Sequence, residues 1–157
     1  GLKWPNDLWW RDRKLAGVLI ETANLGRVNG SRFVVFCFGL YIHTPDGTGM
    51  ATAPAGLLEL LPGVDAGQAL ERIALPLAQT LALFESQGFS PFQAAFNARD
   101  ALRQQEVNLS DGRRGVAVGV DANGALLLQT GQAVQKVISA EVSVRPVFAP
   151  DPDVLRA

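Results

Sequence analysis

The chain has 157 residues, of which 48% are hydrophobic and 18% are charged, and its formal net charge is −1. This composition predicts a folded chain of one domain, or of one domain plus a small appendage, and excludes disorder. The near-neutral charge predicts no binding of nucleic acid or of a membrane surface. A single cysteine and a single histidine exclude a disulfide framework and argue against a metal site built from these residues. No apolar run approaches the ~20 residues that span a bilayer, and no secretory signal is recognisable. We therefore expect a reduced, cytoplasmic setting.

The first twenty-one residues are the most specific stretch of the sequence. Two apolar runs, 8–10 and 15–20, flank a polar link and predict a β-hairpin. Pro5 fixes its own φ and favours an extended residue before it, so the chain enters the hairpin as a stiff segment. Such a hairpin can bring Lys3, Asn6 and Lys14 together.

The segment Lys3-Trp-Pro-Asn-Asp7, followed seven residues later by Lys14-Leu-Ala-Gly-Val-Leu-Ile-Glu21, resembles the biotin protein ligases. The spacing of the two halves matches that family as well as the residues do. The resemblance implies that biotin's carboxylate attacks the α-phosphate of ATP to give biotinyl-adenylate and pyrophosphate. A lysine of a biotin carboxyl carrier domain then attacks the mixed anhydride. ATP and biotin are thus the implied substrates, Mg²⁺ accompanies the triphosphate, and the carrier domain of a carboxylase is the implied partner.

The resemblance also implies roles for single residues. Lys14 matches the lysine that stabilises negative charge during adenylation, and Lys3 would add phosphate or ribose contacts. Asn6 would bind the nucleotide, and Asp7 would orient a lysine or help to hold Mg²⁺. The residues expected along the bound biotin and adenylate are Gly17, Leu19, Gly39 and Leu40.

A strand predicted over 32–38 leads into Gly39 and Leu40. In the resembled family this place reads Gly-x-Gly-Ile/Leu-Asn-Val. Here Cys37 stands where the first glycine is usual, and Tyr41 replaces the asparagine, so ligand affinity or identity is open at this point. We expect Cys37 to be a small buried hydrophobic residue.

The middle of the chain predicts turns and helices. Asn29-Gly30 predicts a tight turn, and a short helix is expected over 56–61. Asp65 is the predicted N-cap of a helix over 66–87, which Pro76 should kink or split. A second helix is expected over 91–102. The first helix carries an apolar stripe that predicts core packing, formed by Leu70, Ile73, Leu77, Leu81 and Phe84.

From residue 103 onwards, short apolar runs separated by turn residues predict a small β-barrel or sandwich. These runs cover 107–109, 115–120, 125–129, 134–138 and 142–147. The segments 119–127 and 140–143 resemble the SH3-like C-terminal domain of the same family. The predicted class is α+β: a mixed β-sheet backed by helices, followed by an SH3-like β-barrel. The predicted domains are a ligase half over 1–102 and a barrel over 103–150, with a tail over 151–157.

The family's Gly/Arg-rich loop, which closes over biotin and the adenylate, does not occur in this sequence. We therefore expect the C-terminal half of a ligase, incomplete for catalysis, with no DNA-binding domain. Two alternatives stay open. One is a non-catalytic remnant or binding module of the same fold, which could pair with itself through an exposed sheet edge. The other is a relative of the lipoate ligases, which fit the Trp-Pro-Asn-Asp motif less well.

Overall fold

The computed structural model describes residues 1–23, 33–138 and 143–147. The chain forms two compact units, Gly1–Ser86 and Gln87–Ala157, and the predicted α+β class is confirmed. The predicted turn at Asn29-Gly30, most of the 140–143 motif and the tail 151–157 lie outside the described residues. Within the described part of the chain, no helix combines the length and the hydrophobicity that crossing a membrane requires.

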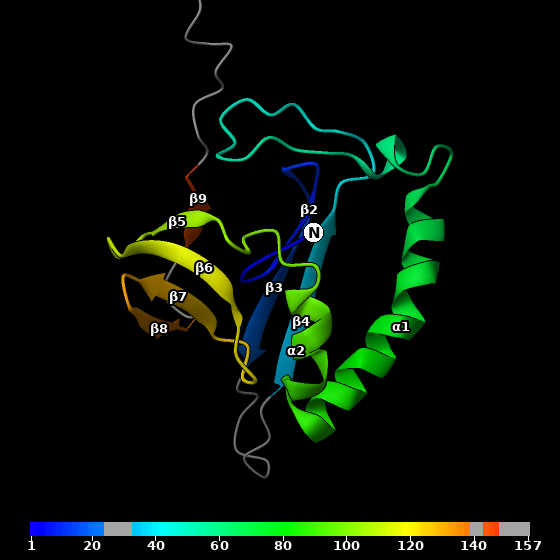
Figure 1. The fold of residues 1–157 in the computed structure, drawn as a ribbon. Helices are drawn as coiled ribbons and strands as arrows, with labels where there is room; N and C mark the ends of the chain where they lie inside the picture. The colour runs from blue at the N-terminus through cyan, green and yellow to red at the C-terminus, as the bar shows by residue number, and fades with distance from the viewer. Residues whose placement is uncertain (24–32, 139–142, 148–157) are drawn as a thin grey trace, which may run out of the picture. The chain divides into compact units, whose positions relative to one another are not determined.

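The first unit is built on a four-stranded sheet in the order β1-β2-β3-β4 (Figure 1). Its strands are β1 (Leu2–Lys3), β2 (Asp7–Trp10), β3 (Arg13–Ala23) and β4 (Phe33–Leu40), and they pair antiparallel. The predicted hairpin is therefore confirmed. Its two-residue turn places Arg11 and Asp12 at φ 49° and 59°, the left-handed geometry that matches the twist of such a hairpin. An isolated parallel bridge joins Lys14 to Pro54.

The core of the first unit lies at the base of the hairpin, where Trp4, Trp9, Leu15, Ala16 and Ala55 are buried. The outer halves of β3 and β4 are exposed, because no described element covers them. Leu19, Ile20 and Phe36, for example, keep 55%, 57% and 39% of their surface exposed. The predicted burial of Cys37 is wrong for the same reason: it lies on β4 and is exposed.

Helix α1 (Ala66–Gln87) has the predicted bounds and runs through Pro76 without being split. Asp65 caps it as predicted: its Oδ1 accepts a bond from the Gln68 N–H (2.8 Å), and the Gln68 side chain accepts one from the Asp65 N–H (3.2 Å). The 3₁₀ helix η1 (Leu57–Glu59) stands where the short helix was expected.

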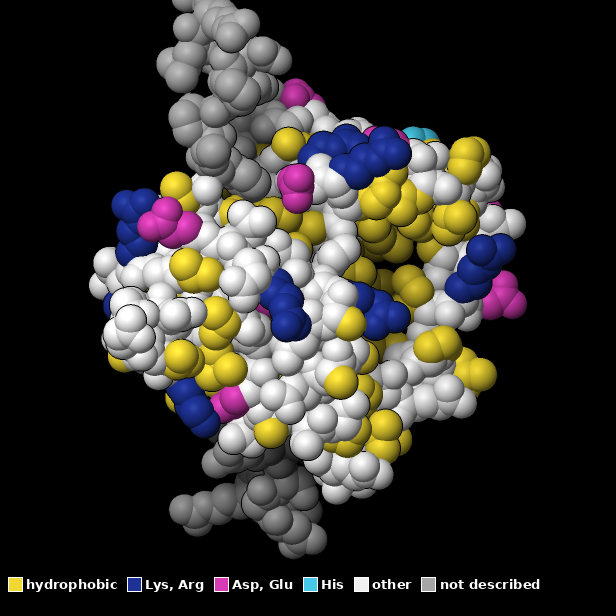
Figure 2. Space-filling view, in the orientation of Figure 1, with side chains coloured by type: hydrophobic (Ala, Val, Ile, Leu, Met, Phe, Trp, Pro, Cys, Tyr) yellow, Lys and Arg dark blue, Asp and Glu magenta, His cyan; other side chains and the backbone are white. Residues whose placement is uncertain are grey.

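The predicted core stripe of α1 is wrong, because its side chains are half-buried or exposed. Ala69 is the one buried residue of α1, whose whole length is described. Leu70 and Phe84 are about half exposed, at 54% and 48%. Figure 2 shows hydrophobic side chains around a hollow beside this helix. The stripe thus faces a surface that the described residues leave uncovered.

The second unit begins with the 3₁₀ helix η2 (Ser90–Phe92) and α2 (Gln93–Asn97). The helix predicted over 91–102 is therefore wrong in its second half. Asn97 turns its side chain to the sheet, where its Oδ1 accepts a bond from the Val120 N–H (2.8 Å). Residues 101–104 then form turns, with Gln104 at φ 62°.

Five short strands follow, as predicted, and form an antiparallel sheet in the order β8-β7-β6-β5-β9. They are β5 (Glu106–Leu109), β6 (Arg114–Val120), β7 (Leu126–Thr130), β8 (Ala133–Val137) and β9 (Val144–Pro146). The largest fully buried side chains of this unit belong to Leu102, Val107, Val120, Leu126, Leu128, Val137 and Val144. Residues 87–102 group with this sheet, and the predicted domain bounds at 102 and 150 stay a prediction.

Candidate functional site

One row of residues crosses all four strands of the first sheet. Lys3 lies opposite Asp7, Asp7 opposite Gly17, and Gly17 opposite Gly39. Directly opposed residues in antiparallel strands share a face, so this row places two charged side chains beside two glycines. Leu19 and Cys37 form the next pair on the same face.

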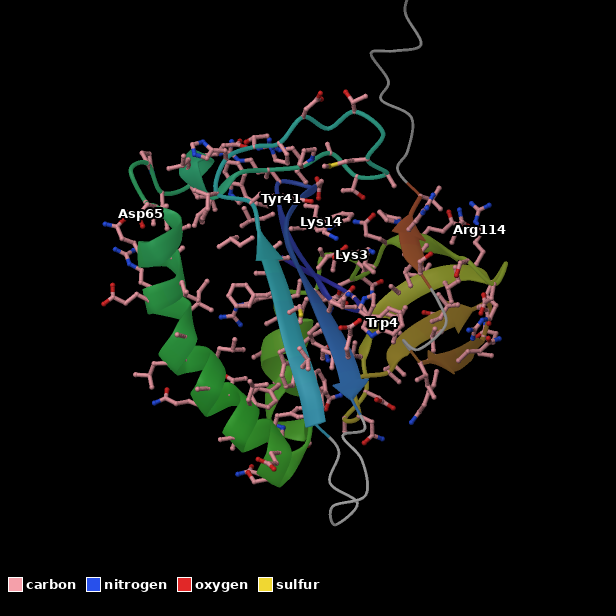
Figure 3. The ribbon with its side chains drawn as sticks, turned by 180° about the vertical axis from the view of Figure 1, so that it is seen from behind. Lys3, Trp4, Lys14, Tyr41, Asp65 and Arg114 are labelled. Carbon is pink, nitrogen blue, oxygen red and sulfur yellow. The ribbon has the colours of Figure 1, made fainter. Side chains whose placement is uncertain are left out.

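Asp7 lies between two lysine ammonium groups. Its Oδ1 is 2.7 Å from the Nζ of Lys14, and its Oδ2 is 3.7 Å from the Nζ of Lys3. The side chains of Lys3 and Asp7 are only 12% and 14% exposed, whereas that of Lys14 is 35% exposed. The three groups carry a net positive charge, and Lys14 is the most exposed of them. Figure 3 labels the two lysines.

The two glycines of the row have different surroundings. A Cβ at Gly17 would lie 3.1 Å from both the Nζ of Lys14 and the Oδ1 of Asp7. The lysine side chain therefore extends across Gly17, where a larger residue would displace it. A Cβ at Gly39 would meet no atom within 4 Å. The sheet thus offers a floor of bare backbone next to an ammonium group, which suits the close approach of a ligand ring.

Asn6 fastens the Trp-Pro-Asn turn to β3. Its Nδ2 donates to the Val18 carbonyl (2.6 Å), and its own carbonyl accepts from the Val18 N–H (2.8 Å). The peptide bond between Trp4 and Pro5 in this turn is cis. Asn6 therefore anchors this turn to β3 with one side-chain and one backbone hydrogen bond.

The predicted pocket residues divide between the two faces of the sheet. Gly17, Leu19 and Gly39 share the face of the charged row. Leu40 pairs with Ala16, and the alternation of side chains along a strand places it on the opposite face. The structure therefore brings Lys3, Asp7, Lys14, Gly17, Leu19 and Gly39 together on one surface and turns the Leu40 side chain away from it.

The described residues do not fit a protein-held Mg²⁺. No group of three His, Cys, Asp or Glu side chains in the described ranges could hold a metal ion. Asp7, the predicted candidate, already lies against two ammonium groups. A cation beside it would face their repulsion, so Mg²⁺ fits here only as a companion of a bound triphosphate.

A second segment contacts the backbone of Lys14. The Lys14 N–H donates to the Ala53 carbonyl, and the Ala55 N–H donates to the Lys14 carbonyl, both at 2.8 Å. Arg13 forms a two-pronged ion pair with Glu59, at 2.5 and 3.1 Å. These bonds, with others from Thr44 and the Gly56 N–H, lower the pKa of Glu59 to about 2. Sequence reasoning missed Glu59, because no local pattern signals a partner 46 residues away.

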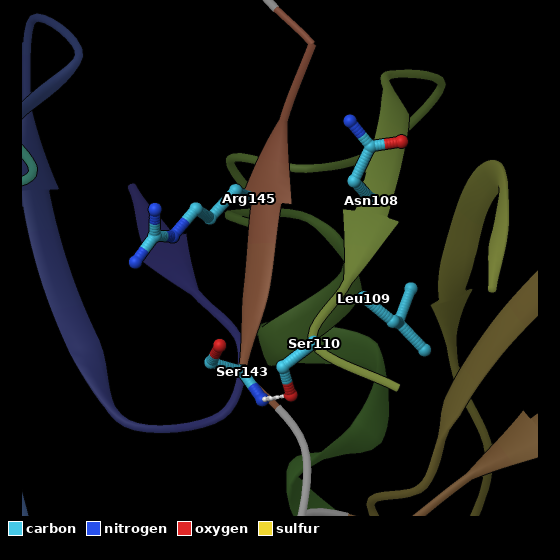
Figure 4. A pocket seen from close by; sticks show the side chains of 5 residues that line it. All are labelled: Asn108, Leu109, Ser110, Ser143 and Arg145. Atoms are coloured by element: carbon cyan, nitrogen blue, oxygen red, sulfur yellow. Dashed lines mark hydrogen bonds between the residues drawn. The ribbon is translucent and has the colours of Figure 1, made fainter. Parts of the chain in front are cut away.

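The second unit holds a separate cavity of about 240 Å³ beside the paired strands β5 and β9 (Figure 4). The Ser143 N–H donates to the Ser110 Oγ there, at 3.0 Å. The side chains that line the cavity are polar apart from one leucine, and they belong to Asn108, Leu109, Ser110, Ser143 and Arg145. Sequence patterns assign these residues to strands and turns alone.

Comparison with known proteins gives concordant matches. Residues 105–145 match the family model of the biotin protein ligase C terminal domain. The bifunctional ligase/repressor BirA of Escherichia coli is 28% identical over 149 residues, which cover 92% of this chain and 46% of that protein. The biotin–[acetyl-CoA-carboxylase] ligase of Paracoccus denitrificans is 30% identical over 149 residues, covering 90% of this chain and 61% of that protein.

The fold has the same relatives among solved structures. The biotin protein ligase of Aquifex aeolicus in complex with biotin and ATP matches with a TM-score of 0.77 and 23% identity, covering 93% of this chain and 62% of that one. A biotin protein ligase-like protein of unknown function from Silicibacter matches with a TM-score of 0.66 and 17% identity, over 87% of this chain and 59% of that one.

The two sheets and their order in the chain thus have the α+β fold of the solved biotin protein ligases. The comparisons agree with the resemblance that the motifs predicted: the chain is similar to biotin protein ligases over about nine tenths of its length, and residues 105–145 match the family's C-terminal domain model. It spans about half the length of the curated BirA relatives that it matches, 46% in the Escherichia coli protein.

Proposed function

We propose that this chain supplies the lysine-bearing part of an ATP-dependent ligase that attaches biotin to a lysine of a biotin carboxyl carrier domain. The reaction would pass through biotinyl-adenylate. The observation that carries the proposal is the Lys14 ammonium, which lies over Gly17 and beside the open backbone at Gly39. A flat ligand on this floor would present its carboxylate to a positioned cation.

The residues that the structure brings together on this face have distinct proposed tasks. Lys14 would stabilise the negative charge that develops between the biotin carboxylate and the α-phosphate, which is an electrostatic task suited to a fixed ammonium. Asp7 would hold Lys14 in place from 2.7 Å. Lys3 would add positive potential for the phosphates, and Gly17, Leu19 and Gly39 would border the biotin rings.

The relatives support the proposed substrates. The Aquifex aeolicus structure contains biotin and ATP, and the two lysines beside Asp7 suit a substrate that bears a carboxylate and phosphates. Asn6 would contact the nucleotide, and Leu40 would contribute backbone where β4 ends. Mg²⁺ would arrive with ATP. A cytoplasmic setting and a carrier domain as protein partner complete the proposal.

A binding module of the same fold is the second candidate. One feature favours it: the outer halves of β3 and β4 are exposed. Such a module would bind the adenylate without forming it.

Calorimetric titration of the 157-residue chain with a stable biotinyl-adenylate analogue tests both candidates. We expect saturable binding that Lys14→Ala weakens and that Lys136→Ala leaves unchanged. Lys136 is a matched control, because it also pairs with an aspartate, at 2.8 Å from Asp121. Absence of binding by the chain and by the full-length protein would contradict the proposal, and tighter binding of a lipoyl-adenylate analogue would favour a lipoate ligase relative.

Turnover separates the enzyme from the binding module. In the full-length protein, Lys14→Ala should raise the barrier to adenylate formation by about 2–4 kcal/mol, measured as pyrophosphate release, with the fold intact. Lys14→Arg should also slow the reaction, because a planar guanidinium replaces a compact ammonium. Unchanged pyrophosphate release in Lys14→Ala would contradict the assignment of Lys14, whereas binding without turnover in the wild type would favour the module.

A further inference from the structure

The carboxylate of Glu59 joins three separate segments of the first unit. Its Oε1 accepts bonds from the Thr44 Oγ1 (2.5 Å), the Gly56 N–H (2.9 Å) and the Arg13 Nη1 (3.1 Å). Its Oε2 accepts a bond from the Arg13 Nη2 (2.5 Å). A two-pronged arginine–carboxylate pair is among the strongest and most directional polar contacts in proteins.

The same carboxylate closes the loop 44–56. Thr44 and Gly56 stand at the two ends of this loop, and both donate to Oε1. The ends approach so closely that a Cβ on Gly56 would collide with the Thr44 backbone nitrogen. Only glycine fits at this crossing, so the sequence and the geometry both favour a closed loop base.

The closed loop base is bonded to Lys14. Arg13 directly precedes Lys14, and the loop residues Ala53 and Ala55 bond the N–H and the carbonyl of Lys14, both at 2.8 Å. The Arg13 guanidinium also lies 5.2 Å from the Trp10 ring, which limits its freedom on the other side. Displacing the Glu59 carboxylate would therefore release both the loop base and the residue that precedes Lys14.

We propose that Glu59 is a positioning residue: it fixes the backbone of Lys14 against the loop 44–56 without touching substrate. The catalytic consequence rests on the proposed function, whereas the effect on the backbone does not. Asp7 would then hold the ammonium group of Lys14, and Glu59 would fix the backbone from which the Lys14 side chain extends. Two carboxylates from distant parts of the chain would thus define where the ammonium lies.

Amide hydrogen exchange tests the backbone effect directly. In Glu59→Gln, which keeps an acceptor but loses the charge, the Lys14 and Ala55 amides should exchange about tenfold faster, because each charge-assisted bond is worth more than a neutral one. The Val18 amide, which bonds Asn6, should keep its rate. Glu106→Gln is the matched control, since Glu106 also pairs with an arginine, at 2.7 Å from Arg114.

A second variant tests the same ion pair from its other partner, in case Glu59→Gln fails to fold. Arg13→Lys keeps the positive charge but removes the planar guanidinium that bonds both oxygens of Glu59. It should therefore accelerate hydrogen exchange at the same two amides. Wild-type exchange rates at Lys14 and Ala55 in both Glu59→Gln and Arg13→Lys would overturn the proposal.

Kinetics of the full-length protein test the catalytic consequence. Glu59→Gln should lower kcat for adenylate formation about tenfold and leave the KM for ATP within about twofold, because Glu59 acts on the position of Lys14 and not on substrate affinity. Equal kcat in the wild type and Glu59→Gln would overturn this part. A wild type without any adenylate formation would instead refute the proposed function, and the exchange rates would still decide the role of Glu59 in the backbone.

Discussion

At the scale of single residues, Lys14 illustrates how the hairpin converts sequence spacing into proximity. Lys14 and Asp7 lie 2.7 Å apart, because the two-residue turn folds β3 back along β2. The spacing of the motif therefore predicts the hairpin, but not the register shift between Leu8 and Trp9 that sets Asp7 opposite Gly17. It does not indicate that Leu40 turns its side chain away, since this depends on the register of β4.

Asp100, in the second unit, is a residue whose environment opposes its charge. Its Oδ1 accepts a bond from the Leu102 N–H (2.9 Å), but its Oδ2 is buried and has no hydrogen-bond partner within the described ranges. Burial raises the pKa of this carboxyl above its ordinary value of 3.8, against the opposing effects of that bond and of Arg103. The ionised form is therefore less stable in the folded protein than in the unfolded one.

This predicts a pH dependence of stability. A carboxyl with a raised folded-state pKa favours folding fully below its unfolded pKa, and this contribution is lost as the pH rises through the folded-state pKa. Asp100→Asn should therefore raise the free energy of unfolding at pH 7, by up to about 1 kcal/mol, and change it little near pH 3. Denaturant unfolding at both pH values measures the difference. A variant that is less stable at pH 7 would contradict the prediction.

At the scale of elements, α1 depends on its own sequence more than on packing. A capping box starts it, the helix continues through Pro76, and Ala69 is its single buried residue over its fully described length. Helices with little packing are sensitive to intrinsic propensity. The proline lacks the N–H that would bond the carbonyl four residues earlier.

Pro76→Ala should therefore stabilise the first unit. Restoring the N–H and removing the ring should raise the free energy of unfolding by about 1–3 kcal/mol. The greater conformational entropy of the unfolded chain without proline reduces this gain. Chemical denaturation followed by far-UV circular dichroism measures the gain. Gln79→Ala is a control on the same exposed helix and should change stability by less than about 0.5 kcal/mol. A loss of stability in Pro76→Ala would show that the proline is accommodated without cost.

Local signals explain which elements could be predicted. The bounds of α1 follow from Asp65 at one end and Gly88 at the other, and the short strands of the second unit follow from the turn residues between them. The helix predicted over 91–102 failed because the Asn97 side chain bonds to Val120 instead of facing solvent. That contact joins residues 23 positions apart, so no pattern within the helix predicts it.

At the scale of the whole molecule, the exposed apolar surface of the first unit is the dominant feature. Val34, Val35, Phe36 and Phe38 of β4 are each at least 39% exposed. β4 also ends the order of the sheet, so its outer edge is unpaired among the described residues. Uncovered edges with apolar faces favour association. Sequence patterning predicted the strand itself and not this exposure, because an apolar run is the same whether or not another element covers it.

We therefore expect the isolated chain to self-associate. Val35→Lys should weaken this association at least about tenfold, because it places a charge on the edge strand. The folded chain should accept this lysine, because it lies opposite Glu21 on β3. Sedimentation velocity over a range of concentrations measures the effect. Val134→Lys is the matched control, since Val134 is an exposed valine of the other sheet, at 57%. A chain that stays monomeric throughout would contradict the prediction.

Cys37 gives the molecule a property that concerns its experimental use. It is the only cysteine of the sequence, it is exposed, and it lies opposite Leu19 on the face of the charged row, two residues before Gly39. A maleimide dye would therefore attach at one position, beside the bare backbone floor. The natural sequence already carries a single labelling site whose fluorescence would report when that floor is occupied.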